Sequence, residues 1–266
     1  MRILDQIGRE LQLDQAPHRM VSLVPSITEL AHDLGYDVIG KTKFCIHPEG
    51  LESVTVVGGT KNVKVEVVQK LSPDLVVANK EENTKDVVDA LIRAGLPVFV
   101  SDVSTLDQSL DLINLLGQIG GFQRRAEELI GVIANGLESI PSLEPRLKAL
   151  YLIWQKPYMA AGVDTYISDL MAHLGMVNVM SVWGERGRRY PEVDSDQLKA
   201  LNPDLILLSS EPFPFKETHC KLIREEFGIH TFLVDGECFS WYGSRQAKSI
   251  DYLKDFSRLL SNYDKN

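Results

Sequence analysis

The sequence predicts an α/β protein built from two similar halves, and an internal repeat is the first observation behind this prediction. Residues 71–77 read LSPDLVV and residues 201–207 read LNPDLIL, at an offset of 130 residues. Leu34-Gly35 matches Leu174-Gly175 upstream at an offset of 140, and residues 95–102 match 228–235 downstream at an offset of 133. Three matches in the same order and at similar spacing indicate a duplication.

The second observation is that each half alternates short apolar, β-rich runs with helical patterns, which is typical of α/β units. Near-continuous apolar runs suit strands of a parallel sheet, because helices cover both of its faces. In both halves a Pro-Asp pair directly precedes such a run, where proline cannot disturb the hydrogen-bond ladder. The predicted strands are residues 20–24, 75–78 and 98–100, then 150–154, 205–208 and 232–234.

A connecting segment is predicted between the halves. Apolar residues recur at helical spacing from Leu106 to Leu137, with one break at Gly120-Gly121. Pro141 and Pro145 end the pattern, because proline lacks an N–H and clashes with the preceding turn. Residues 123–140 would form a helix of about 27 Å, stiffer than a Gly/Ser linker. The predicted domains are an N-terminal lobe (1–104), a connecting helix segment (105–145) and a C-terminal lobe (146–266).

Composition excludes several classes of protein. The 266 residues are 44% hydrophobic and 24% charged, as in ordinary globular proteins, and the net charge of −9 argues against a nucleic-acid partner. The sequence contains no run of 18 apolar residues, so it predicts no membrane-spanning helix. Three scattered cysteines do not suggest a disulfide framework. The charged N-terminus is unlike a secretory signal, so the sequence as given predicts a cytoplasmic location.

Enzyme signatures are missing from the sequence. It contains no GxSxG, HExxH or CxxC motif and no glycine-rich phosphate loop. Cys45 and His47 alternate along one stretch, which does not place them in the geometry of a nucleophile and its base. Two such ligands do not make a zinc site either. We therefore expect a binding protein with no catalytic residues, no metal site of its own and no intrinsic cofactor.

The motifs taken together resemble a known family. The segment from Arg19 to Leu30, which reads RMVSLVPSITEL, is similar to the start of the helical-backbone periplasmic substrate-binding proteins of ABC importers. Gly58-Gly59, Glu66 and the two PDL motifs continue the pattern, and the resemblance covers about residues 17 to 260. These proteins bind ferric siderophores, haem or vitamin B12, and the vitamin B12-binding branch looks most similar.

The resemblance implies two Rossmann-like lobes joined by one long rigid helix, with the ligand in a cleft between them. It implies a small-molecule ligand that is a cobalt corrinoid or a ferric chelate, an ABC permease as partner, a monomer, and a periplasmic location. Two alternatives remain open. One is a cytoplasmic binding module without a transporter, and the other is an enzyme on the same fold.

The resemblance also implies that one carboxylate on each lobe docks to arginines of the permease. The matching positions are Glu66 and Asp196, each eight residues before the Asp of its PDL motif. Carboxylate–guanidinium pairs are strong and directional. The family usually has Glu at the second position, so the shorter Asp196 is a departure. The simpler alternative is that both acids favour the first turn of a helix through its dipole.

Candidate ligand-binding residues lie in loops that follow predicted strands, where ligands of α/β proteins usually bind. Aromatic and Arg side chains there could stack on a flat ring or pair with an anionic edge. A serine, Ser26, begins the first helix in a Ser-x-x-Glu pattern, and we expect it to be a helix cap. The candidate contacts are Phe44, Cys45, His47, Tyr158, Trp183, Arg188, Arg189, Tyr190, Trp241, Tyr242 and Arg245.

Overall fold

The computed structural model describes residues 1–144, 146–183 and 188–262. These residues form a mixed α/β protein that divides into two compact units. The first unit comprises Met1–Val103, Asp107–Ala134 and Tyr242–Ala247, and the second comprises Ser104–Leu106, Asn135–Trp241 and Lys248–Asn266. The predicted fold class of two α/β parts with parallel sheets is confirmed.

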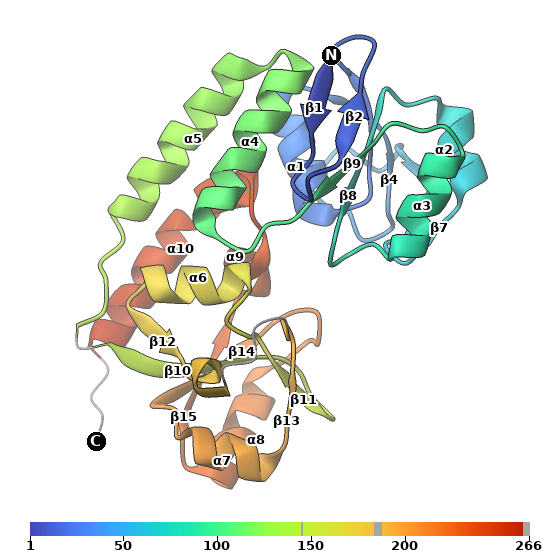
Figure 1. Ribbon diagram of the computed structural model, residues 1–266. Coiled ribbons are helices and arrows are strands. Elements are labelled where there is room, and N and C mark those ends of the chain that lie inside the picture. Colours follow the sequence, from blue (N-terminus) through green and yellow to red (C-terminus); the bar gives the residue numbers. More distant parts are fainter. Residues whose placement is uncertain (145, 184–187, 263–266) are drawn as a thin grey trace. The chain divides into compact units, whose positions relative to one another are not determined.

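A five-stranded parallel sheet in the order β5-β4-β3-β8-β9 is the centre of the first unit (Figure 1). Its strands are β3 (Arg19–Ser22), β4 (Asp37–Lys41), β5 (Thr55–Val56), β8 (Leu75–Asn79) and β9 (Val98–Ser101). Two short hairpins accompany it, β1 (Arg2–Leu4) with β2 (Glu10–Gln12), and β6 (Gly58–Gly59) with β7 (Asn62–Val63). Its helices are α1 (Pro25–Leu34), α2 (Val65–Leu71), α3 (Lys85–Arg93), most of α4 (Leu106–Gly120) and most of α5 (Gln123–Glu138).

The second unit has a six-stranded sheet that is mixed rather than wholly parallel. Strands β12, β10, β14 and β15 run parallel, while β11 and β13 continue the sheet antiparallel beyond β10. The strands are β10 (Leu147–Trp154), β11 (Tyr158–Ala160), β12 (Met176–Asn178), β13 (Glu192–Val193), β14 (Leu205–Ser209) and β15 (His230–Val234). The helices are α6 (Tyr166–His173), η1 (Val179–Trp183), α7 (Ser195–Leu201), α8 (Glu217–Phe227), α9 (Gly236–Ser240) and α10 (Ser244–Ser261).

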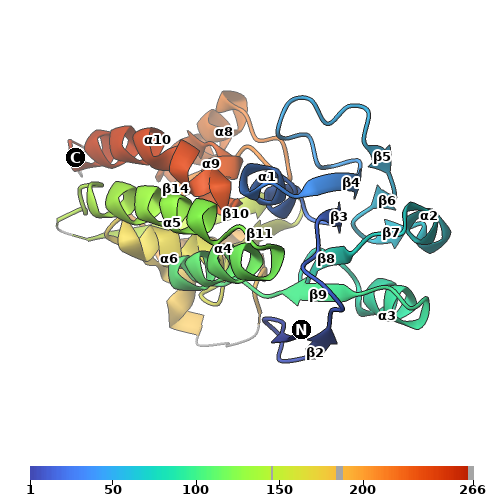
Figure 2. The same ribbon diagram turned by 90° about the horizontal axis from the view of Figure 1, so that it is seen from above.

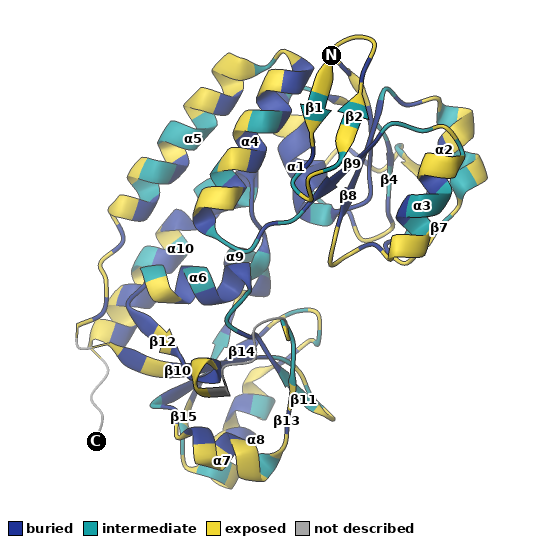
Figure 3. Cartoon of the chain, in the orientation of Figure 1, coloured by how far each residue is buried: buried dark blue, intermediate teal, exposed yellow. Residues whose placement is uncertain are grey.

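The apolar runs became central strands, as predicted. Every residue of β8, β9 and β14 is buried, and Figure 3 shows the strands of each sheet mostly in dark blue. In the first unit Val68, Val88 and Leu91 of α2 and α3 pack on one face of the sheet. In the second unit Leu198, Leu201 and Ile223 of α7 and α8 pack on β10 and β14 in the same way.

The connecting segment holds two helices, α4 and α5, and Figures 1 and 2 show them side by side. The predicted helix over residues 123–140 corresponds to α5, which ends at Glu138. The chain turns between α4 and α5 at Gly121, whose φ of +76° suits glycine. The division between the units falls within α4, α5 and α10 rather than at residues 104 and 145. Pro145 lies outside the described residues.

The repeated PDL motif has one structure in both units. Ser72 and Asn202 cap α2 and α7 in the left-handed conformation, with φ of 48° and 44°. After the proline, Asp74 Oδ2 accepts from the backbone N–H of Arg19 at 2.8 Å, and Asp204 Oδ2 accepts from that of Lys148 at 2.7 Å. Each Asp therefore ties the start of one strand to the start of its neighbour, β8 to β3 and β14 to β10.

An N-terminal turn covers the edge strand β9 of the first unit. The carboxylate of Asp5, which is 5% exposed, accepts from the backbone N–H of Val100 at 3.2 Å. Gln6 N–H donates to Val100 O at 3.2 Å, and Arg9 Nη2 donates to Val98 O at 3.0 Å. The turn thus occupies backbone groups that no strand pairs with on this side of β9 among the described residues.

Candidate functional site

The loops after the parallel strands gather at the carboxyl-terminal edge of each sheet, where ligands of α/β proteins bind. In the first unit a polar network orders this edge. Asn79, the last residue of β8, donates from Nδ2 to Ser101 Oγ at 3.1 Å and to Tyr242 Oη at 3.0 Å. Its Oδ1 accepts from Glu81 N–H at 2.8 Å, and its own N–H donates to Asn83 Oδ1 at 2.8 Å. The edge is therefore fixed by bonds within this unit.

Tyr242 belongs to that network rather than to an open surface. Its side chain is largely buried, and burial raises the pKa of its phenol, with Ser101 and Ser26 as hydrogen-bond neighbours. Ser26 itself is the second residue of α1, and Val24 is the N-cap without a side-chain bond. The predicted Ser26 capping box is wrong because α1 begins at Pro25, which already has the φ that a helix needs.

The loop after β4 separates the three candidates that it carries. Phe44 is 50% exposed and has Lys43 Nζ 4.9 Å from its ring centre. His47 is half-buried and precedes a cis proline. Cys45 is 1% exposed, its thiol lies 3.2 Å from Thr42 Oγ1, and burial raises the pKa of that thiol. Among the candidate contacts of this loop, Cys45 therefore packs inward, while Phe44 and His47 keep some exposure.

Arg245 forms an internal ion pair. Its Nε lies 2.9 Å from Glu29 Oε2, and the two side chains are 14% and 2% exposed. Glu29 is the acid of the Ser-x-x-Glu pattern in α1, so the charge of Arg245 balances a buried carboxylate of its own unit. A contact of Arg245 with an anionic ligand stays a prediction.

Three candidates of the second unit, Arg188, Arg189 and Tyr190, lie in the loop before β13. Arg189 Nη2 donates to Ser104 Oγ at 2.8 Å, and its carbonyl accepts from Gly162 N–H at 2.7 Å. Gly162 is required there, since a Cβ would come within 2.4 Å of Arg188 O. Arg188 is exposed and Tyr190 half-exposed. Trp183 ends η1, and its side chain lies outside what the structure describes, as do residues 184–187.

Trp241 and Tyr158 complete the candidates of this unit. Trp241 is 9% exposed and donates from Nε1 to Glu211 Oε1 at 2.6 Å. Tyr158, in β11, is half-buried and lies edge-on to Phe227 of α8, with ring centres 6.4 Å apart. Whether the candidates of both units face one cleft stays a prediction.

Sequence reasoning missed an aromatic pair at the carboxyl-terminal edge of the second sheet. Trp154, the last residue of β10, is 39% exposed, and its ring centre lies 5.5 Å from that of Phe213 in the loop after β14. Phe213 N–H donates to Ile153 O at 3.3 Å, which holds this loop against the end of β10. The signal was the segment EPFPF directly after the predicted strand at 205–208. An exposed aromatic pair of this kind can stack on a flat ligand.

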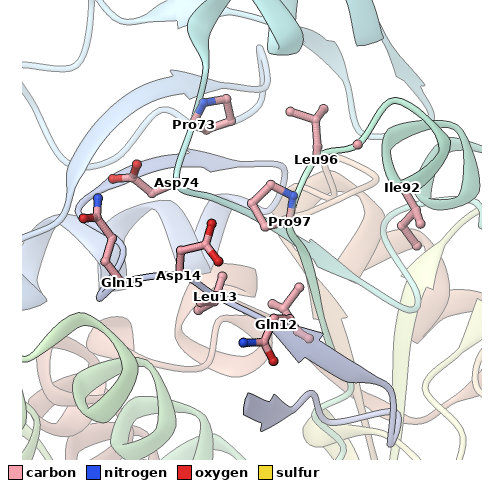
Figure 4. Close-up of a pocket in the computed structure, with 11 residues that line it drawn as sticks. Gln12, Leu13, Asp14, Gln15, Pro73, Asp74, Ile92, Leu96 and Pro97 are labelled. Atoms are coloured by element: carbon pink, nitrogen blue, oxygen red, sulfur yellow. The ribbon is translucent and has the colours of Figure 1, made fainter. Parts of the chain in front are cut away.

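A groove of about 710 Å³ lies at the opposite, amino-terminal edge of the first sheet (Figure 4). Its walls come from residues 11–15 and from the turns before β8 and β9, including Asp74, Leu96 and Pro97. Asp74 already accepts two backbone N–H groups, His18 and Arg19, so its carboxylate serves the fold. The groove therefore does not coincide with the edge at which the candidate residues gather.

The proposed docking acids occupy equivalent positions. Glu66 and Asp196 are each the second residue of their helices, α2 and α7, and both are exposed. The cap of α7 is Asp194, which accepts from Gln197 N–H at 2.8 Å, so Asp196 is not needed for capping. Within the described residues no cluster of three His, Cys, Asp or Glu could hold a metal, and no helix is long and apolar enough to cross a membrane.

Comparison with known proteins gives one family over most of the chain. The family described as periplasmic binding protein matches residues 20–225. An ABC transporter substrate-binding lipoprotein of Bacillus subtilis, YvrC, is 26% identical over 215 residues, which are 76% of this chain and 67% of the relative. A vitamin B12-binding protein of Yersinia pestis is 24% identical over 200 residues, covering 73% and 70%. These relatives are binding proteins of transporters, not enzymes.

Solved structures share the fold at low identity. The periplasmic vitamin B12-binding protein of Vibrio cholerae has a TM-score of 0.75 at 17% identity, covering 93% of this chain and 99% of that one. A periplasmic haem-binding protein of Roseiflexus has a TM-score of 0.76 at 19% identity, covering 92% and 98%. A possible iron-binding protein of Staphylococcus epidermidis has 0.73 at 23%, covering 91% and 98%.

Proposed function

This chain belongs to the periplasmic binding protein family, and on that premise we propose that it is the substrate-binding component of an ABC importer with a corrinoid, haem or ferric chelate as its ligand. The observation that carries the proposal is the family match over residues 20–225, which runs from β3 in the first unit to α8 in the second. Relatives over this region bind vitamin B12 or are ABC transporter substrate-binding proteins. We also propose an extracytoplasmic location, because the Bacillus subtilis relative is a lipoprotein. The monomeric state expected from the family resemblance is part of the same proposal.

The residues at the carboxyl-terminal edges supply suitable chemistry. Trp154, Phe213 and Phe44 offer partly exposed aromatic faces, and such faces stack on planar macrocycles. Arg188 and Arg189 lie in a loop of the second unit beside Tyr190, where guanidinium groups can meet an anionic side group. The half-buried His47 is suited to an axial contact with a metal centre, because neutral imidazole is a good ligand.

A ligand panel tests the proposal. Cyanocobalamin, haemin and a ferric hydroxamate siderophore are titrated into the purified chain, and tryptophan fluorescence and ligand absorbance are followed. We expect saturable one-to-one binding of one of the three. Replacing Trp154 by Leu should weaken that binding by about two- to tenfold, because a stacked aromatic contact is worth roughly 0.5 to 1.5 kcal/mol beyond its buried area.

The matched control for that variant is Val132→Ala, which changes an exposed apolar side chain on α5. Binding should be unchanged in this variant. A full panel without saturable binding to the wild-type chain would overturn the proposed ligand classes. Binding that survives Trp154→Leu unaltered would remove the aromatic pair from the site while leaving the function in place.

Docking to a permease is the second part of the proposal. Glu66 and Asp196 present exposed carboxylates at equivalent helix positions, and neither forms an ion pair within the described residues. Arginines of a permease would form charge-assisted bonds with both. The alternative of a binding module without a transporter makes the same prediction for ligand binding and the opposite one for docking.

The docking test is co-elution with the purified permease of the same transport system in detergent. Glu66→Gln and Asp196→Asn should each reduce complex formation, and the double variant should abolish it while ligand binding is unchanged. Glu225→Gln changes an exposed acid on α8 and serves as the control for net charge. Equal complex formation by the wild type and the double variant would exclude docking through these carboxylates.

A further inference from the structure

Glu211 is a half-buried acid at the carboxyl-terminal edge of the second sheet. It follows β14 by two residues and lies in the same loop as Phe213. Its backbone N–H lies 3.5 Å from Ser209 Oγ, and Ser209 in turn bonds Tyr151 of β10 at 3.0 Å. Glu211 is therefore held among the ends of strands β10 and β14, where the proposed ligand contacts of this unit lie.

Three neighbours orient the Glu211 side chain. Oε1 accepts from Trp241 Nε1 at 2.6 Å and from Ser240 Oγ at 3.4 Å. Gly236 leaves room for it, since a Cβ at Gly236 would come within 2.5 Å of Glu211 Cγ. Oε2 accepts no hydrogen bond from any residue that the structure describes. One oxygen is thus fixed by the protein while the other keeps its capacity to accept.

The charge of Glu211 has no balance within the described residues. It forms no ion pair with any of them, whereas the buried Glu29 of α1 in the first unit is paired with Arg245. Burial raises the pKa of the Glu211 carboxyl, and the neighbouring acids Glu237 and Asp235 raise it further. Holding Trp241 in place needs only a neutral acceptor such as a glutamine oxygen. A half-buried carboxyl that a neutral group could replace indicates a use for the second oxygen.

We propose that Glu211 contacts the ligand and selects one whose rim presents N–H donors over one whose rim presents carboxylates. This inference rests on the proposed function and names the substrate class of the same site. A carboxylate oxygen accepts a strong bond from an amide N–H, while a carboxylate on the ligand would be repelled by it. Among metal macrocycles, a corrinoid bears amide side groups and haem bears propionates, so the selected class is an amide-bearing macrocycle.

The test uses two ligands that differ only at the rim. Haemin carries two carboxylates, and in its diamide both are converted to amides, so stacking and metal chemistry are matched. Each is titrated into the wild-type chain, Glu211→Gln and the control Glu225→Gln, together with cyanocobalamin. Thermal melts check that each variant is folded, and Trp241 fluorescence checks that its bond to residue 211 is kept.

We expect the wild-type chain to bind haemin diamide more tightly than haemin. In Glu211→Gln this preference should fall by about tenfold or more, because a charged hydrogen-bond acceptor is replaced by a neutral one. Cyanocobalamin binding should weaken in the same variant, and Glu225→Gln should behave as the wild type.

The possible outcomes test the role of Glu211 separately from the proposed function. A wild-type chain that binds macrocycles with a preference unchanged in Glu211→Gln would overturn the role of Glu211 and leave the proposed function standing. A wild-type chain that binds only the ferric siderophore of the ligand panel would overturn this inference and leave the proposed function standing. A wild-type chain that binds neither the siderophore nor any of these macrocycles would overturn both. A loss of affinity that is equal for haemin and its diamide would show Glu211 to be only a structural anchor for Trp241.

Discussion

The two units have the same turn at the amino-terminal edge of their sheets, and they differ at the carboxyl-terminal edge. In both, a residue in the left-handed conformation, a proline and an Asp precede a central strand, β8 or β14. The Asp accepts a hydrogen bond from a backbone N–H of the neighbouring strand, β3 or β10. At the opposite edge the first unit has the Asn79 and Asn83 network, while the second has Trp154, Phe213 and Glu211. The repeated residues hold neighbouring strands together, and the unrepeated ones include the ligand contacts that we propose.

Removing Arg245 should produce the largest loss of stability, because its ion pair with Glu29 is buried. This pair lies in the first unit. Arg245→Ala leaves a buried carboxylate without its cation, and the expected loss is about 3 to 5 kcal/mol in the free energy of unfolding. Arg189→Ala in the second unit should cost about 1 kcal/mol, since it removes a bond to Ser104. Urea unfolding measures both.

A double variant sharpens this test. Glu29→Gln together with Arg245→Ala removes the stranded charge, so it should be more stable than Arg245→Ala alone. If the single and double variants unfold at the same urea concentration, the Glu29 charge is not what makes the loss of Arg245 costly. In that case the stem of Arg245 contributes through packing instead.

The next effect tests whether the two PDL turns are equivalent. Asp74→Ala and Asp204→Ala should each lower the free energy of unfolding by about 2 kcal/mol, because each removes a charged acceptor of backbone N–H groups. A twofold or larger difference between them would show that the repeated sequence no longer does equal work in the two units. Glu225→Ala, at an exposed helix position, is the control.

Lowering the pH should also show the contribution of Asp74. Its carboxylate accepts the N–H groups of His18 and Arg19, and we call this set of hydrogen bonds the Asp74 clamp. The N–H groups of Arg19 and His18 lower the pKa of Asp74. The clamp therefore contributes stability above the ordinary Asp pKa of about 4, and this contribution is lost as the pH falls through the lowered pKa. The difference in stability between the wild type and Asp74→Ala should shrink over that range. A difference that stays constant down to pH 2 would contradict the clamp.

The smallest effect concerns the helices that carry Glu66 and Asp196. Helix α7 has a capping box between Asp194 and Gln197. The N-cap residue of α2 is Lys64, and its side chain forms no capping hydrogen bond. Asp194→Ala should therefore cost about 1 kcal/mol, and Lys64→Ala close to nothing. Thermal melts of the two variants measure this, and equal costs would mean that the capping box does not stabilise α7.

The strands and the repeat could be read from the sequence because they rest on local patterns. Apolar runs such as 75–78 and 205–208 became buried strands, and the Pro-Asp pairs marked their starts. The break at Gly120-Gly121 marks the end of α4, and the predicted helix over residues 123–140 follows it as α5. Hydrophobic periodicity gives the type of an element more reliably than the path that it takes in space.

The site was harder to predict because its contacts are distant in sequence. Arg245 meets Glu29 across 216 positions, and Trp241 meets Glu211 across 30, so neither pairing has a local signal. The buried thiol of Cys45 has Thr42 and Thr28 of α1 as hydrogen-bond neighbours, and the contact with α1 cannot be seen in the sequence of the Cys45 loop alone. Trp154 was assigned to a strand end, and its exposure becomes visible only once Phe213 is brought beside it.

The turn of Asp5 and Arg9 over β9 has a consequence for self-association. A strand at the rim of a parallel sheet is a template on which another chain can add its own strand, and this is a common first step toward fibrils. In this protein the bonds to Val98 and Val100 occupy the groups that such a chain would use. The turn therefore lowers the tendency of two copies of this protein to join through this edge.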